Sequence, residues 1–137
     1  MDGYGGVIAG GVKDTIRSGA DYSAILGGRL NTISGDYSTI SGGRGLTLDG
    51  NGSFGFLGNN GGGTNNMTIS TANTATFANT DLWLANNDGA ASELRFYEAQ
   101  SSNGAFPAGT TNYTALRAGT QSADVTYTLP TAAPTSV

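Results

Sequence analysis

Cysteine and histidine are both absent from the 137 residues of this chain. Zinc and haem sites, thiol chemistry and Ser-His or Cys-His catalytic pairs depend on these two residue types. The sequence therefore predicts no cofactor, no metal site and no catalytic residue, and we expect the chain not to be an enzyme.

Positive charge is scarce as well. Lys and Arg together number six against ten Asp and Glu, which gives a net charge of −4. Phosphate recognition needs a basic stripe, so we expect no nucleic-acid partner. No segment approaches the run of about 18 apolar residues that a membrane span needs, so we expect no membrane insertion. No signal peptide is visible either.

Proline occurs three times and charged residues make up 12% of the chain, whereas disordered chains usually contain more of both. Glycine, in contrast, occurs 23 times and without the three-residue period of collagen. Each Gly destabilises a helix interior by about 1 kcal/mol relative to Ala, so long helices are not expected. The composition predicts an all-β protein with many tight turns.

Pairs of glycines divide the first part of the chain into similar copies. The pairs stand 17 and then 15 residues apart, at Gly10-Gly11, Gly27-Gly28 and Gly42-Gly43. Apolar residues recur between them at the same spacing and form two columns. The first column is Ile16, Ile33 and Leu48, and the second is Ile8, Ile25, Ile40 and Phe56.

The two columns are about half a period apart, which predicts a coil with two short strands per turn, each pointing one apolar residue inward. The paired glycines would form the corners, where the backbone often needs a positive φ. We therefore predict a β-solenoid over residues 1–59.

Each coil has few large apolar residues. Ordering 15 residues costs on the order of 15–25 kcal/mol, whereas burying two or three aliphatic side chains returns about 5–9 kcal/mol. This shortfall predicts that faces of the coil are buried against sister chains in a symmetric oligomer.

Within residues 19–58, YSAILGG at 22–28 and YSTISGG at 37–43 resemble the head repeats of trimeric autotransporter adhesins. They also resemble the Gly-Gly repeats of bacterial and phage tail-fibre proteins. The resemblance implies a left-handed trimeric β-roll, and hence a homotrimer as the functional form.

A Gly/Asn-rich stretch at residues 60–66 predicts a linker, followed by a small β domain at residues 67–130 and a tail at 131–137. Short alternating runs predict the strands of that domain. The runs are 67–69, 75–77, 82–84, 93–97, 113–116 and 125–129. Asn86-Asn87-Asp88-Gly89 predicts a tight turn that joins the Trp83 run to the Phe96 run, and residues 103–104 and 107–109 predict a second connection.

Residues 76–136 also resemble a module that recurs in large bacterial surface and phage tail-fibre proteins, where it follows Gly-Gly repeats. The resemblance rests on two segments, NTDLWLANNDGAASELRFYEAQ at 79–100 and NYTALRAGTQSADVTYTLPTAAPTS at 112–136. It implies a structural connector.

Three aromatic residues, Tyr22, Tyr37 and Trp83, are candidates for a glycan platform, although packing between coils explains the tyrosines and a small core explains Trp83. Asp21 and Asp36 stand one above the other in the repeat, where an Asp usually caps its own turn. The two glutamates, Glu93 and Glu98, differ by five positions on a strand and so point to opposite faces, unlike a glycosidase pair.

These observations predict a structural segment of a trimeric extracellular, cell-surface or virion fibre, which serves as shaft and junction. The alternative is a head that binds a receptor or glycan on a host surface. Both share the same fold and differ in whether the surface carries a site.

Overall fold

The computed structural model describes residues 4–58, 66–99, 104–107 and 111–131, and every regular element within them is a β-strand. The chain divides into two compact units, residues 1–82 and residues 83–137. We call the first unit the solenoid and the second the connector. The predicted fold class, a short β-solenoid followed by a small antiparallel β-structure, is confirmed.

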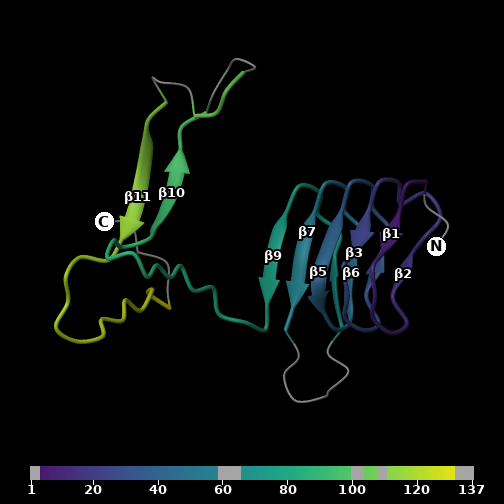
Figure 1. The fold of residues 1–137 in the computed structure, drawn as a ribbon, viewed down its shortest axis with the longest axis horizontal. Helices are drawn as coiled ribbons and strands as arrows, with labels where there is room; N and C mark the ends of the chain where they lie inside the picture. Colours follow the sequence, from purple (N-terminus) through teal and green to yellow (C-terminus); the bar gives the residue numbers. More distant parts are fainter. Residues whose placement is uncertain (1–3, 59–65, 100–103, 108–110, 132–137) are drawn as a thin grey trace. The chain divides into compact units, whose positions relative to one another are not determined.

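The solenoid consists of two parallel sheets between which the chain alternates, making about four turns (Figure 1). One sheet contains, in spatial order, β1 (Val7–Ile8), β3 (Ala24–Ile25), β5 (Thr39–Gly43), β7 (Phe54–Leu57) and β9 (Ala75–Ala78). The other contains β2 (Thr15–Ile16), β4 (Thr32–Ile33), β6 (Leu46–Leu48) and β8 (Met67–Ile69). Strands this short are stable only because each coil pairs with the next.

The core lies between the two sheets and is closed within a single chain. Ile16, Ile33 and Leu48 are in register on neighbouring strands, and each is at most 1% exposed. The other fully buried apolar residues are Ala20, Ile25, Ile40, Leu46 and Leu57. Ile8, at the first coil, is half-buried and packs against this cluster. The interior columns are therefore covered within one chain, and burial of the outer faces against sister chains stays a prediction.

Phe56 does not continue the column of Ile25 and Ile40. Gly55, 15 residues after Ile40, stands opposite Ile40 and continues that column. Because side chains alternate along a strand, Phe56, the next residue, points to the other face. Gly55 and Leu57 are buried, whereas Phe56 is only half-buried.

The second glycine of each pair is the one that the fold requires. Gly28 has φ +108°, and a Cβ there would overlap the carbonyl oxygen of Gly43 and approach the side chain of Asn31. Gly43 has φ +94°, and a Cβ would overlap the backbone of Leu57. A Cβ at the first glycine, Gly10 or Gly27, would meet no atom within 4 Å. The second glycine is therefore required where successive coils touch.

Buried serines form a polar ladder along the solenoid. The Ser38 and Ser53 backbone N–H groups donate to Ser23 Oγ at 3.0 Å and Ser38 Oγ at 3.1 Å, respectively. The Oγ atoms of Ser23 and Ser38 in turn donate to the carbonyls of Gly35 and Gly50. These hydroxyls satisfy backbone groups that the tight corners leave out of the sheets.

The solenoid continues beyond the Gly/Asn stretch that predicts a linker at 60–66. After it, β8 pairs in parallel with β6, and β9 pairs with β7. The equivalent positions Ser53 and Thr74, on either side of the stretch, are 21 residues apart, whereas Ser23 and Ser38 are 15 apart. Residues 60–65 themselves lie outside the described part of the chain.

Among its described residues, the connector contains one antiparallel pair, β10 (Glu93–Tyr97) and β11 (Tyr113–Arg117). The runs at 82–84 and 125–129 are not strands, and the predicted hairpin between the Trp83 and Phe96 runs is not formed. β10 takes β11 as its partner instead, with Glu93 opposite Arg117 and Tyr97 opposite Tyr113. Residues 103 and 108–109 of the second connection, and 132–137 of the tail, lie outside the described residues.

Candidate interaction surfaces

Three tyrosines form a ridge at one corner of the solenoid. The rings of Tyr22 and Tyr37 are stacked, with centroids 5.4 Å apart and planes 9° apart. Tyr4 meets Tyr22 edge-on, with centroids 5.6 Å apart. All three rings are more than half exposed, at 72%, 54% and 66% for Tyr4, Tyr22 and Tyr37. We call Tyr4, Tyr22 and Tyr37 the tyrosine ridge.

The backbone beneath the ridge is a regular ladder. The N–H groups of Tyr22, Tyr37, Gly52 and Asn73 each donate to a carbonyl of the preceding coil at 2.8 Å. Equivalent corner residues all have positive φ, at Gly5, Tyr22, Tyr37, Gly52 and Asn73. Gly and Asn are the residues that tolerate this conformation best, whereas for a bulky residue it is an outlier. Two coils nevertheless carry a tyrosine there.

Asp21 and Asp36, next to the ridge, bind backbone groups of neighbouring coils. Asp21 Oδ1 accepts a hydrogen bond from the Tyr4 N–H at 2.8 Å, and Asp36 Oδ1 accepts one from the Asp21 N–H at 2.9 Å. Asn51 does the same for the Asp36 N–H. These residues thus link one coil to the next and do not cap their own turns.

Trp83, the third residue of the predicted glycan platform, lies in the connector and not in the solenoid. It is 83% exposed and lines an open depression beside Glu93, Arg95 and Arg117.

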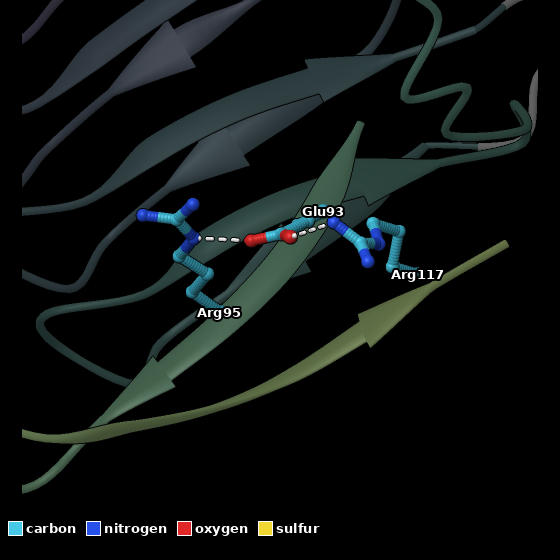
Figure 2. Close-up of polar contacts among 3 residues, drawn as sticks. All are labelled: Glu93, Arg95 and Arg117. Carbon is cyan, nitrogen blue, oxygen red and sulfur yellow. Dashed lines mark hydrogen bonds and ion pairs between the residues drawn. The ribbon is translucent and has the colours of Figure 1, made fainter. Parts of the chain in front are cut away.

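Glu93 is held between two arginines on one face of the connector sheet (Figure 2). Its carboxylate accepts from Arg95 Nε at 2.5 Å and from Arg117 Nη1 at 3.1 Å. The hydrogen bond from Arg95 is the main reason that the pKa of Glu93 is lowered, and the charges of both arginines add to the effect. Glu98 instead accepts hydrogen bonds from Asn112. The two glutamates therefore have separate partners.

The opposite face of the connector sheet is apolar and uncovered. Leu94 stands opposite Leu116, and the two are 41% and 64% exposed. An open groove on this face is completed by Leu84, Val125 and Tyr127. None of the connector residues that the structure describes is buried. The connector sheet thus has an apolar face without a core.

The outer faces of the solenoid sheets differ from each other. On the sheet that contains β7 and β9, Phe54 and Phe77 lie with ring centroids 5.7 Å apart, and Phe77 is 48% exposed. On the other sheet, threonines are in register along β2, β4, β6 and β8, at Thr15, Thr32, Thr47 and Thr68. The threonine column was missed from the sequence, although the repeated Thr-Ile pairs at 15–16 and 32–33 were visible.

No family model, curated protein or solved structure matches this chain. Within the described residues, no group of three or more acidic side chains is placed to hold a metal ion. No helix in that part of the chain is long and apolar enough to cross a bilayer.

Proposed function

We propose that the chain is a structural segment of a trimeric fibre on a cell surface or virion, in which the solenoid is the shaft and the connector is the junction. This function is supported by the resemblance of the Gly-Gly repeats, and of the segments at 79–100 and 112–136, to fibre proteins. The observation that carries it is the apolar face of the connector sheet.

That face identifies the part of the chain that needs a partner. A two-stranded hairpin is at best marginally stable alone in water. Covering Leu94, Leu116 and Val125 contributes about 1.5–3 kcal/mol for each side chain that becomes fully buried. Two further copies of the connector can cover this face. In a trimer with threefold symmetry, the same apolar face of each copy points toward the symmetry axis, where the three faces meet.

The solenoid fits the role of a shaft for a different reason. Its core is complete within one chain, and its coils repeat along a single axis through parallel backbone pairing. Each coil adds about 4.8 Å of length. A shaft of this kind can be lengthened by adding coils, because each coil packs only against its neighbours and repeats the same core.

Light scattering on the full chain tests the proposal. We expect a mass of three times the chain mass of 13.8 kDa at micromolar concentration. The double variant Leu94→Ser, Leu116→Ser should fall to the mass of one chain. Leu26→Ser is the matched control, because Leu26 is 55% exposed on the solenoid and its loss should leave the trimer intact.

A wild-type protein that remains a single chain at this concentration, with a cooperatively melting connector, would contradict the proposal. A mass of two chains would contradict the threefold symmetry. If only the Leu26 variant lost the trimer, the interface would lie on the solenoid and not on the connector.

A further inference from the structure

Two residues of the tyrosine ridge, Tyr22 and Tyr37, occupy positions at which the fold itself favours other residues. Equivalent positions in other coils are Gly5, Gly52 and Asn73, all with positive φ. Tyr22 and Tyr37 adopt φ +53° and +54° in the same ladder. Side chains kept in a strained backbone conformation are concentrated at functional sites.

Core packing does not explain these tyrosines. Both rings are more than half exposed, and the neighbouring core positions are filled by Ile25 and Ile40. What the rings do make is a continuous stack, because Tyr22 lies between the edge of Tyr4 and the face of Tyr37. Rings held in such a stack lose little conformational freedom when a ligand binds.

One end of the stack is open. In the next coil the equivalent residue is Gly52, which has no side chain to continue the stack over Tyr37. A Cβ at Gly52 would lie 2.7 Å from Asn73 Oδ1, so an amide group borders this end. The open end of the stack thus combines the exposed Tyr37 ring with the Asn73 amide beyond Gly52, a composition that suits an amphipathic ring.

We propose that the tyrosine ridge binds a carbohydrate. The apolar face of a pyranose ring stacks on Tyr37, and the sugar hydroxyls are directed toward the Asn73 amide. The size of the ridge favours a sugar over a protein partner. Three aromatic rings, each more than half exposed, present roughly 300–500 Å², whereas a standard protein interface takes about 800 Å² from each side. The site lies on the solenoid and is independent of the trimer interface proposed for the connector.

The test is a titration of the full chain, followed by NMR of the tyrosine rings, with methyl β-D-glucopyranoside, methyl β-D-galactopyranoside and N,N′-diacetylchitobiose. We expect at least one probe to shift the Tyr37 and Tyr22 ring signals at millimolar concentration. Tyr37→Asn should weaken this binding about tenfold or more while keeping the melting temperature, because Asn73 shows that Asn fits this corner.

Two controls separate this site from other aromatic residues. Tyr127→Asn removes a tyrosine that is 88% exposed on the connector, and Trp83→Ala removes the exposed tryptophan. Neither should change the binding. Light scattering measures the oligomer mass of each variant separately from sugar binding. A protein that is not a trimer can therefore be distinguished from one that does not bind sugar.

The proposal is overturned if none of the three sugars shifts the tyrosine signals. It is also overturned if binding persists in Tyr37→Asn, or if it is lost in Trp83→Ala. A marked fall in the melting temperature of Tyr37→Asn would show that the ring serves the fold.

Discussion

Asp14 and Asn31 occupy equivalent positions in successive coils and differ in one terminal group. Asp14 Oδ1 accepts from the Asn31 N–H at 2.8 Å, as Asn31 Oδ1 accepts from the Leu46 N–H at 3.1 Å. Asn31 Nδ2 also donates to the Gly43 carbonyl at 3.1 Å. Asp14 Oδ2 stands at the corresponding place, buried and without a hydrogen-bond partner in the described structure. An amide is therefore a better fit to this corner than a carboxylate.

Asp14→Asn should accordingly stabilise the solenoid. The new Nδ2 group can donate to the Gly28 carbonyl, as Asn31 does to Gly43, and a typical hydrogen bond contributes about 1 kcal/mol. We expect the free energy of unfolding, measured by urea titration, to rise by about that amount. Asp49→Asn is the control, because Asp49 is exposed and should give no gain. A less stable Asp14→Asn protein would contradict the equivalence of the two corners.

At the scale of elements, side-chain charge supports the β10–β11 pair. Glu93 lies opposite Arg117 across the two strands and beside Arg95 on its own strand. Because the folded pKa of Glu93 is below its ordinary value of 4.5, this carboxylate stabilises the pair above that pH. The contribution is lost as the pH falls from 4.5 through the lower folded pKa.

The two arginines should have unequal effects on Glu93. Arg95→Gln removes the largest cause of the lowered pKa and should raise it more than Arg117→Gln does. Carbonyl ¹³C shifts of Glu93, followed from neutral to acidic pH in each variant, measure this directly. An equal or reversed order would mean that the cross-strand pair with Arg117 is the dominant contact.

Element boundaries also show where sequence patterns stop being informative. The strands at 67–69, 75–77 and 93–97 are visible as alternating runs, but their partners are not. Gly/Asn-rich stretches occur both in linkers and in loops inserted into a coil, so composition alone cannot distinguish the two. β10 could not be assigned to β11 from the sequence either, because a nearer turn signal at residues 86–89 predicts a different hairpin.

At the scale of the whole molecule, the two units differ in how they achieve stability. Among the described residues, eight apolar side chains of the solenoid are buried, whereas none of those in the connector is. Amides in a closed core exchange slowly, and those in an exposed hairpin exchange quickly unless a partner covers them.

Hydrogen exchange should therefore depend on protein concentration in one unit only. Amides of β3, β5 and β7 should stay protected at every concentration. Those of β10 and β11 should gain protection only at concentrations at which light scattering detects the trimer. Equal protection of the connector at the lowest concentration would show that it is stable without other copies.

The sequence by itself determined the all-β class, the coil length and the two inward-facing columns, because each follows from local spacing and from the absence of helix-forming stretches. Only the tertiary structure decided that the column passes through Gly55 and not Phe56, that the solenoid continues beyond the Gly/Asn stretch, and that the connector sheet has an exposed apolar face. All three depend on which strand pairs with which and in what register, and a shift of one residue changes that pairing while leaving the local pattern intact.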